Sequence, residues 1–269
     1  MKVAICVHPE KLRSEGLKDN IAKWLAKRGH EIVSEHAEGI DIAIILGGDG
    51  FTMHAAGAFS PKGVPVIALN IGDVGFLTSR NISDCEELLE RLDSNAYRIE
   101  KRMGLALSFN NKLGPCKNER LGPFVNDVYL KHSQSMGIFE IKVDDEVIHK
   151  GLRADGFIVS TPTGSTAYNM GARGPILLPD MSAFALTPIC PYNCNTWPIV
   201  ADGKSEIKIK VISTRGSDCI HLIADGNKIC NLFAGEEIMV NKHETKMLFA
   251  VLDRRDYLAA LQKKKGLMD

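Results

Sequence analysis

The order of apolar and polar residues changes character near residue 97. Before this point, short apolar runs alternate with segments whose apolar residues recur at helical spacing. In the clearest such segment, Leu17, Ile21 and Leu25 share one helical stripe, and Gly29 follows two basic residues as a C-terminal signal. Strands alternating with helices predict an open, parallel, Rossmann-like sheet. The runs of strand character in this part are 2–8, 30–36, 41–46 and 64–72.

After residue 97, strand-like runs recur with few helical stripes. The stretch 207–212 alternates apolar and polar residues in period two, and Asp225-Gly226-Asn227 has the composition of a hairpin turn. This pattern predicts a mostly antiparallel β-sandwich. The sequence thus predicts two domains: a Rossmann-like α/β domain at 1–97, against which a helix at 254–266 packs, and a mostly β domain at 98–253.

Composition narrows the class of protein. The 269 residues are 45% hydrophobic and 25% charged, which is ordinary for a globular protein with a real core. Lys plus Arg and Asp plus Glu both number 33, so no basic excess points to nucleic acid. Apolar runs are too short for a membrane span or a secretory signal, and the seven scattered cysteines lack zinc-ligand spacing. We expect a cytoplasmic protein with reduced thiols and neither nucleic-acid nor membrane partners.

The first indication of chemistry is the turn Gly47-Gly48-Asp49-Gly50, which directly follows an apolar strand. In open α/β sheets, ligands bind at this edge. Glycines there permit a positive φ and close approach of a ligand, whose phosphates would meet backbone N–H groups at the start of a helix around Phe51. The same four residues also suit an ordinary strand-to-helix turn. Neither a Walker A loop nor a GxGxxG fingerprint is present.

A second polar segment, 155–175, is dense in hydroxyls and small residues. Hydroxyl and amide groups both donate and accept hydrogen bonds, so they suit a ribose or a nicotinamide amide. The alternative is a plain Ser/Thr-rich loop. The candidate ligand-facing residues of this segment are Asp155, Thr161, Thr163, Ser165, Thr166, Tyr168 and Asn169.

Several motifs together resemble those of the NAD kinases, in the family's order. They are GGDG (47–50), NIGDVGFL (70–77), VNDV (125–128), DGFIVSTPTGSTAY (155–168) and LTPICP (186–191). The resemblance implies transfer of the terminal phosphoryl of ATP, or of polyphosphate, to the 2′-hydroxyl of the adenosine ribose of NAD, giving NADP. It also implies a divalent cation, normally Mg²⁺, and a homodimer or homotetramer. By the same resemblance, the β domain at 98–253 would bind NAD and form the oligomer contacts.

The resemblance also implies a role for individual residues. Asp49 matches the general base on the 2′-hydroxyl and lies at NAD, with Gly50 beside it. The matched positions for the ATP phosphates are Gly47, Gly48 and Gly50. Those for NAD are the pair Asn126 and Asp127 at the adenosine end, Asp155 at the nicotinamide end, and Thr163, Thr166, Ala167 and Tyr168 along the dinucleotide. Arg153 and Arg173 are candidate cationic residues by their proximity to this motif, and Arg153 is counted with the NAD site.

Five positions depart from the family's pattern. Phe51 stands where Thr commonly follows GGDG, and Asp127 where Glu is usual. The others are Tyr192, Trp197 and Asn227. The preference for ATP or polyphosphate and for NAD or NADH therefore stays open, as do the subunit contacts.

Two alternatives belong to other functional classes. One is a non-catalytic NAD- or nucleotide-binding sensor, against which the intact Asp49 argues. The other is a lipid or sugar kinase that shares the GGDG turn. The TPTGSTAY block at 161–168 argues against it, as does the lack of a membrane-facing stretch.

Overall fold

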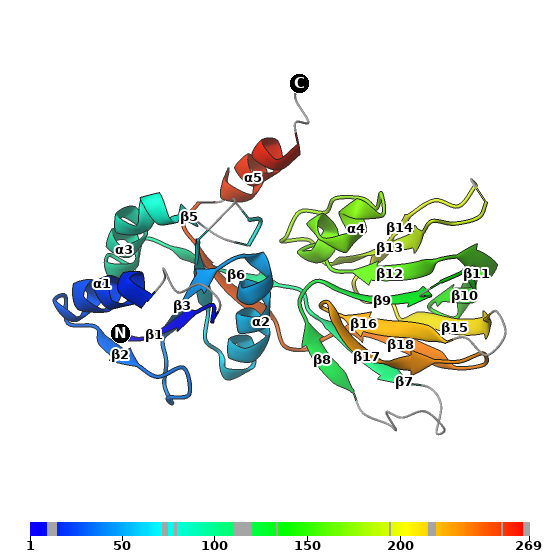
Figure 1. Cartoon of the computed structure of the whole chain (residues 1–269), viewed down its shortest axis with the longest axis horizontal. Helices are drawn as coiled ribbons and strands as arrows, with labels where there is room; N and C mark the ends of the chain where they lie inside the picture. The colour runs from blue at the N-terminus through cyan, green and yellow to red at the C-terminus, as the bar shows by residue number, and fades with distance from the viewer. Residues whose placement is uncertain are drawn as a thin grey trace. The chain divides into compact units, whose positions relative to one another are not determined.

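The computed structural model describes residues 1–9, 15–71, 75–77, 80–109, 120–132, 134–193, 195–214, 219–253 and 255–265. The chain divides into two compact units, the first formed by Met1–Lys101 with Met247–Asp269 and the second by Arg102–Lys246 (Figure 1). The expected second domain, 98–253, is therefore too wide at both ends. The reason is that a strand at each end, Arg98–Arg102 and Met247–Val251, belongs to the sheet of the first unit.

The first unit is built on a seven-stranded sheet in the order β2-β1-β3-β4-β19-β6, with β5 beside β4. Its pairings from β2 to β19 are parallel. The central strands are buried along their whole length, as expected when helices cover both faces. The strands are β1 (Lys2–Val7), β2 (Glu31–Val33), β3 (Ile42–Gly47), β4 (Val66–Asn70), β5 (Arg80–Asn81), β6 (Arg98–Arg102) and β19 (Met247–Val251).

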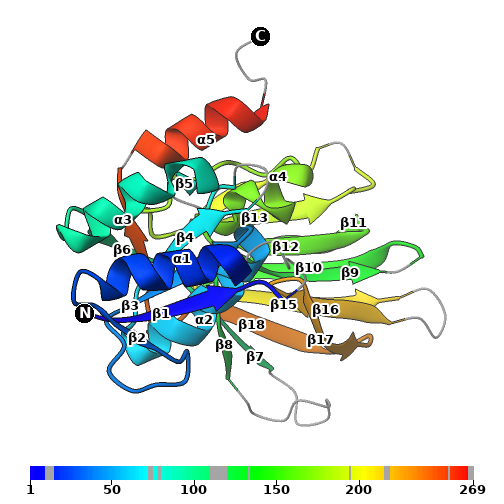
Figure 2. The same ribbon diagram turned by 60° about the vertical axis from the view of Figure 1, so that its left-hand side comes forward.

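The direction of strand addition reverses at β1. The chain leaves β1 for β2 on one side, and β3 then pairs on the other side of β1. Right-handed crossovers in opposite directions place their helices on opposite faces, so α1 and α3 lie side by side on one face and α2 on the other (Figure 2). The helices are α1 (Glu15–Ala26), α2 (Asp49–Phe59), α3 (Cys85–Asp93) and α5 (Arg255–Lys265), with single 3₁₀ turns η2 (Ser60–Lys62) and η3 (Ile82–Asp84).

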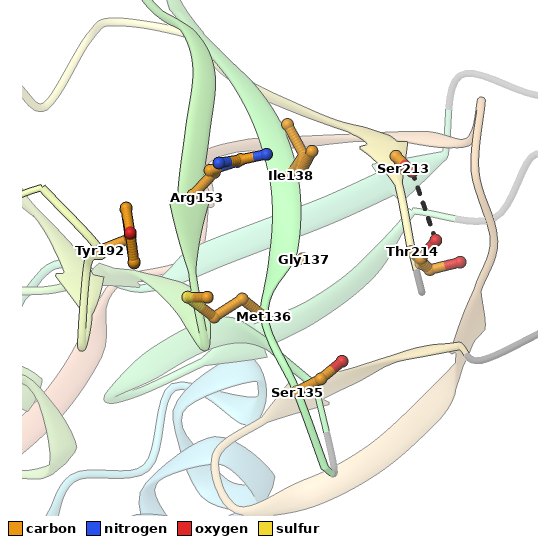
Figure 3. A pocket seen from close by; sticks show the side chains of 8 residues that line it. All are labelled: Ser135, Met136, Gly137, Ile138, Arg153, Tyr192, Ser213 and Thr214. Carbon is orange, nitrogen blue, oxygen red and sulfur yellow. Dashed lines mark hydrogen bonds between the residues drawn. The ribbon is translucent and has the colours of Figure 1, made fainter. Parts of the chain in front are cut away.

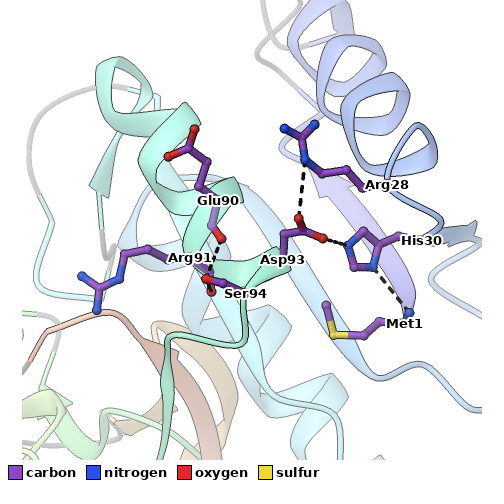
Figure 4. Close-up of polar contacts among 7 residues, drawn as sticks. All are labelled: Met1, Arg28, His30, Glu90, Arg91, Asp93 and Ser94. Carbon is purple, nitrogen blue, oxygen red and sulfur yellow. Dashed lines mark hydrogen bonds and ion pairs between the residues drawn. The ribbon is translucent and has the colours of Figure 1, made fainter.

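A polar cluster joins α1, α3 and the start of β1. His30 Nε2 lies 2.8 Å from Asp93 Oδ1, and Arg28 Nε lies 3.5 Å from Asp93 Oδ2 (Figure 4). The Arg28 guanidinium also stacks on the ring of Trp24 at 3.5 Å. These contacts lie at the amino ends of the parallel strands. The turn Gly47–Gly50, called the Gly-Asp turn below, lies at the opposite, carboxyl ends.

The second unit holds two six-stranded antiparallel sheets, in the orders β11-β10-β15-β18-β7-β8 and β14-β13-β12-β9-β16-β17. One core cluster draws buried residues from both sheets, among them Phe139 of the first and Phe157 of the second, which confirms the predicted β-sandwich. Its strands are β7 (Leu105–Phe109), β8 (Leu121–Phe124), β9 (Asp127–His132), β10 (Gly137–Val143), β11 (Glu146–Ala154), β12 (Gly156–Ser160), β13 (Ala183–Ile189), β14 (Ile199–Asp202), β15 (Ile207–Ser213), β16 (Ile220–Ala224), β17 (Asn227–Leu232) and β18 (Glu237–Lys242).

Helical structure in the second unit is limited to one segment after β12. A 3₁₀ turn, η4 (Gly164–Thr166), leads into the short helix α4 (Tyr168–Gly171). Within the described ranges, no helix of either unit has the length and apolar character needed to cross a membrane.

Candidate active site

Asp49 is the first residue of α2, directly after the carboxyl end of β3. Its carboxylate accepts two backbone hydrogen bonds from the loop after β4: Phe76 N donates to Oδ2 at 2.7 Å and Leu77 N donates to Oδ1 at 3.1 Å. The side chain is only partly buried, while Phe76 and Leu77 are buried. The carboxylate is therefore held in one orientation and keeps an accessible side.

Gly75 makes this arrangement possible. A Cβ built on Gly75 would lie 1.8 Å from Asp49 Oδ1 and 2.5 Å from its Cγ. The structure thus brings together the GGDG turn and the end of the NIGDVGFL motif, whose middle residues, 72–74, lie outside the described residues.

The three glycines of the turn do not use the positive φ that glycine permits. None has a positive φ, and Gly48, the N-cap of α2, is extended with φ −97° and ψ −175°. The lack of a side chain matters at Gly47, where the Phe51 ring packs close to the backbone. A Cβ on Gly47 would lie 2.8 Å from Cδ1 of Phe51, whereas Gly48 and Gly50 have open space where a Cβ would be. The turn needs no left-handed residue, because the chain enters α2 directly from β3.

The Asn126-Asp127 pair lies in the second unit, at the turn into β9. Asp225, the first residue of the β16–β17 turn, accepts hydrogen bonds from the backbone N–H groups of Val125, Asn126 and Asp127 at 2.7, 2.7 and 3.2 Å. One carboxylate therefore fixes three consecutive backbone amides.

Asp127 is 3% exposed. Burial raises the pKa of its carboxyl to about 7, and the negative charge of Asp225 adds to the shift. A carboxyl with this pKa exchanges a proton near neutral pH, so Asp127 is able to donate as well as accept a hydrogen bond.

The polar segment after β12 packs against the same turn. Thr161 N and the carbonyl of Asn126 are 2.8 Å apart, and a Cβ on Gly164 would lie 2.1 Å from that carbonyl oxygen. The Thr163 hydroxyl is buried and has no hydrogen-bond partner among the described residues. A buried donor without a partner is unfavourable unless a ligand or water satisfies it, so Thr163 is a strong candidate for ligand contact.

The side chains of three other candidates in this segment make hydrogen bonds within the protein. The Thr161 hydroxyl donates to Val125 O at 2.7 Å, and the Ser165 hydroxyl donates to Pro162 O at 2.7 Å. The Asn169 amide accepts from the Thr187 hydroxyl at 2.6 Å and donates to the carbonyl of Pro175 at 2.9 Å. These residues hold the segment's shape. Thr166 is also buried, and its hydroxyl makes one long bond within the described part of the chain, to Thr163 O at 3.4 Å.

Tyr168 and Asp155 line one cavity of about 530 Å³ in the second unit. The ring of Tyr168 contacts that of Tyr129 edge to face, with centroids 4.9 Å apart, and Lys131 Nζ lies 5.6 Å from its centroid. Arg173, with φ +64°, lines the same cavity, whereas Ala167 links η4 to α4. An aromatic face, a carboxylate and two cations in one cavity suit a nucleotide-like ligand.

Arg153 lies elsewhere in the second unit. It lines a pocket of about 420 Å³ together with Met136, Ile138 and Tyr192 (Figure 3). The two cationic candidates, both chosen for their proximity to the motif in sequence, therefore lie at different places. Arg173 shares a cavity with Asp155 and Tyr168, and Arg153 does not line that cavity.

Sequence reasoning missed four residues of these sites. Asp225 appeared only as part of a turn, and Gly75 only as part of a motif. Tyr129 and Lys131 contact the Tyr168 ring, and the period-two alternation of β9 from Asp127 is the signal that could have placed them on one face.

Comparisons with known proteins assign the chain to a family. The sequence models of the ATP-NAD kinase N-terminal and C-terminal domains match residues 30–97 and 125–252. The NAD kinase of Treponema denticola is 33% identical, with 98% of this chain and 96% of that protein covered. The NAD kinase of Methanothermobacter thermautotrophicus is 31% identical over the same shares of the two chains.

Two solved structures have the same fold. A crystal structure of yeast NADH kinase complexed with NADH has a TM-score of 0.83 at 23% identity, covering 100% of this chain and 88% of that one. A crystal structure of an NAD kinase from Archaeoglobus fulgidus in complex with ATP has a TM-score of 0.78 at 23% identity, covering 98% of each chain. With the matched domains and relatives, this establishes that the chain belongs to the NAD kinase family.

Proposed function

We propose that the chain transfers the terminal phosphoryl of ATP to the 2′-hydroxyl of the adenosine ribose of NAD, giving NADP. The observation that carries the proposal is the Asp49 carboxylate, fixed by the N–H groups of Phe76 and Leu77 at the carboxyl edge of a parallel sheet. The solved relatives were crystallised with NADH and with ATP, and these two ligand classes support the choice of acceptor and donor.

Asp49 acts as the general base in this proposal. Phosphoryl transfer has a loose transition state, so the attacking hydroxyl needs little base strength early in the reaction. A carboxylate held by two backbone amides orients the hydroxyl and takes its proton late. Positioning and charge neutralisation then supply most of the rate, and the N–H groups at the start of α2 point to where donor phosphates bind.

Besides Asp49 and Gly50, the NAD-binding residues of this proposal belong to the second unit. Asn126 and Asp127 contact the adenosine end, and the Thr163 hydroxyl finds in the dinucleotide the partner it lacks. Tyr168 and Asp155 line the cavity that takes the nicotinamide end. Arg173, as a member of that cavity, is a better candidate than Arg153 for a phosphate of the dinucleotide.

The described residues suit a Mg²⁺ ion that is held mainly by the substrate. Among the described residues, His, Cys, Asp and Glu do not gather in groups of three or more. In kinases Mg²⁺ is commonly held by one or two carboxylates together with substrate phosphates. The cation would be carried mainly by the ATP phosphates, with Asp49 as the nearby carboxylate, and would neutralise charge on the transferred group.

We also propose that the chain works in the cytoplasm as a homodimer or homotetramer. Large apolar side chains are exposed near one edge of the second unit, with Tyr192 69%, Trp197 73% and Val200 49% exposed. These residues lie within 192–200, and exposed apolar patches are typical of protein contacts.

A substrate panel tests the proposal. The purified chain with Mg²⁺ and either ATP or polyphosphate is offered NAD, NADH, diacylglycerol and fructose 6-phosphate, and NADP(H) and ADP are both measured. We expect NADP(H) and ADP in equal amounts from ATP. Release of ADP with a lipid or sugar alone would contradict the proposal, and NAD binding without turnover would favour a sensor.

A further inference from the structure

An aromatic pair lies beside the Gly-Asp turn of the first unit and has no role in the mechanism above. The rings of His8 and Phe51 meet edge to face, with centroids 5.2 Å apart and planes at 71°. His8 directly follows β1, and its N–H donates to Leu46 O of β3 at 3.1 Å. Phe51 belongs to the first turn of α2, and its ring covers Gly47 at the end of β3.

The position of this pair in the sheet is the first step. Strand order reverses between β1 and β3, because β2 lies on one side of β1 and β3 on the other. In open α/β sheets, the crevice at the carboxyl ends of the two strands flanking such a reversal binds the ligand. His8 and Phe51 lie at these two strand ends, and both side chains are only partly buried. A ligand bound at these strand ends would therefore lie beside both rings.

The second step is the orientation of the turn. Asp49 and Phe51 are two residues apart and reach opposite ways along the sheet edge. The Asp49 carboxylate contacts the loop after β4, through Phe76 N and Leu77 N, whereas the Phe51 ring contacts the residue after β1. A donor whose reacting phosphoryl is at Asp49 and whose phosphates lie over Gly48 and Gly50 extends toward His8 and Phe51.

We propose that the His8–Phe51 ring pair is a specificity-determining surface for the phosphoryl donor, which stacks against the base of a nucleoside triphosphate. Aromatic faces bind nucleobases by stacking and offer little to an inorganic phosphate chain. The hydroxyl next in sequence does not compete for this role, because the buried Thr52 side chain donates to Gly48 O at 3.0 Å. The inference rests on the proposed function, since it takes Asp49 as the point of transfer.

Binding measurements test this separately from turnover. Dissociation constants for ATP and for inorganic tripolyphosphate are measured by calorimetry on the whole chain, unmodified and as Phe51→Leu, Phe51→Tyr and His8→Ala. Phe59→Leu is the matched control, because Phe59 is on the same helix but is 6% exposed and belongs to the core. Thermal unfolding of each variant shows whether it is folded.

We expect Phe51→Leu and His8→Ala to weaken ATP binding by about tenfold and tripolyphosphate binding by less than about twofold. Phe51→Tyr, which keeps the ring, and Phe59→Leu should both bind ATP as the unmodified chain does. Equal weakening of ATP and tripolyphosphate would overturn the inference, as would unchanged ATP binding in both variants or an unmodified chain that does not prefer ATP. Failure of the unmodified chain to form NADP, with the binding differences intact, would count against the proposed function alone.

Discussion

Gly75 and Asp49 are packed so closely that a Cβ on Gly75 would lie 1.8 Å from Oδ1 of the Asp49 carboxylate. The next two residues, Phe76 and Leu77, donate their backbone N–H groups to that carboxylate. Residue 75 must therefore lack a side chain for the loop to reach the acid. The glycine acts on the reaction through the position of Asp49.

Gly75→Ala tests this close approach. The added methyl forces the carboxylate or the loop to move, and displacement of a catalytic group by about 1 Å costs on the order of 100-fold in rate. We expect kcat to fall by about this factor, with the dissociation constant for NAD little changed. Steady-state kinetics and NAD titration measure the two effects.

The control is Gly16→Ala on α1. Gly16 is exposed and has open space where a Cβ would be. This substitution should leave kcat unchanged. Full activity of Gly75→Ala would show that the carboxylate adapts and that its position is not critical.

Asp225→Asn tests the anchor of the Asn126-Asp127 turn. The Asp225 carboxylate accepts three backbone N–H groups, and an amide replaces one acceptor oxygen by a donor. Hydrogen bonds to charged groups contribute about 1.5–3 kcal/mol each. We expect the dissociation constant for NAD to rise at least about tenfold, measured by titration, with a lower free energy of unfolding.

Asp202→Asn is the matched control for Asp225→Asn. The Asp202 carboxylate also accepts a backbone N–H in a turn, from Lys204 at 2.7 Å, but the residue is exposed. NAD affinity should be unaffected in this variant. A similar loss of NAD affinity in Asp202→Asn and Asp225→Asn would mean that the effect comes from weaker turns in general and not from the Asn126-Asp127 turn.

The buried Asp127 predicts a pH dependence of stability. Its folded pKa of about 7 exceeds the ordinary value of 3.8, so the folded chain keeps a proton that the unfolded chain has released. The contribution of this group to the free energy of unfolding is therefore greatest at low pH and falls as pH rises from about 4 to about 7.

Asp127→Asn has no such proton to lose. The quantity compared is the free energy of unfolding of Asp127→Asn minus that of the unmodified chain. We expect this difference to be larger at about pH 8 than at about pH 5. Urea denaturation at both pH values measures the difference. An identical difference at the two pH values would mean that burial does not raise the pKa of Asp127.

Tyr257 on α5 predicts an effect of the last helix on catalysis. Its ring centroid lies 6.0 Å from that of Phe76, whose N–H holds Asp49. Tyr257→Ala removes this support, and we expect kcat to fall severalfold while KM for ATP changes less. Leu258→Ala, at a 50% exposed neighbour on the same helix, should have no effect on either constant. If Tyr257→Ala and Leu258→Ala had the same kcat and KM, α5 would not support the position of Asp49.

Much of the fold follows from local patterns. The strand predicted at 41–46 became β3 (Ile42–Gly47), which is fully buried, and in α1 the expected stripe is buried at Ile21 and Leu25. The return of β19 (Met247–Val251) to the first sheet was not predicted. Its pairing with β4 joins residues about 180 positions apart, and nothing in the local sequence specifies a partner strand at that distance.

The candidate site was predicted less evenly. Asp49 and the hydroxyl-rich segment were found by motif, yet composition does not distinguish Thr163, whose hydroxyl lacks a partner, from Thr161, which bonds Val125 O. That difference depends on which backbone group lies opposite each hydroxyl. The role of Asp225 was hidden for the same reason, because its three partners lie 98 to 100 residues away.

The central claim is that Asp49 is the base for phosphoryl transfer to NAD. The most direct test compares Asp49→Asn with the unmodified chain in NADP formation from ATP and NAD, alongside NAD titration. The account predicts that kcat falls by about 100-fold or more, since a positioned base contributes about 10²–10⁴-fold, with the NAD dissociation constant changed less than about threefold. Turnover of Asp49→Asn close to that of the unmodified chain would contradict the account.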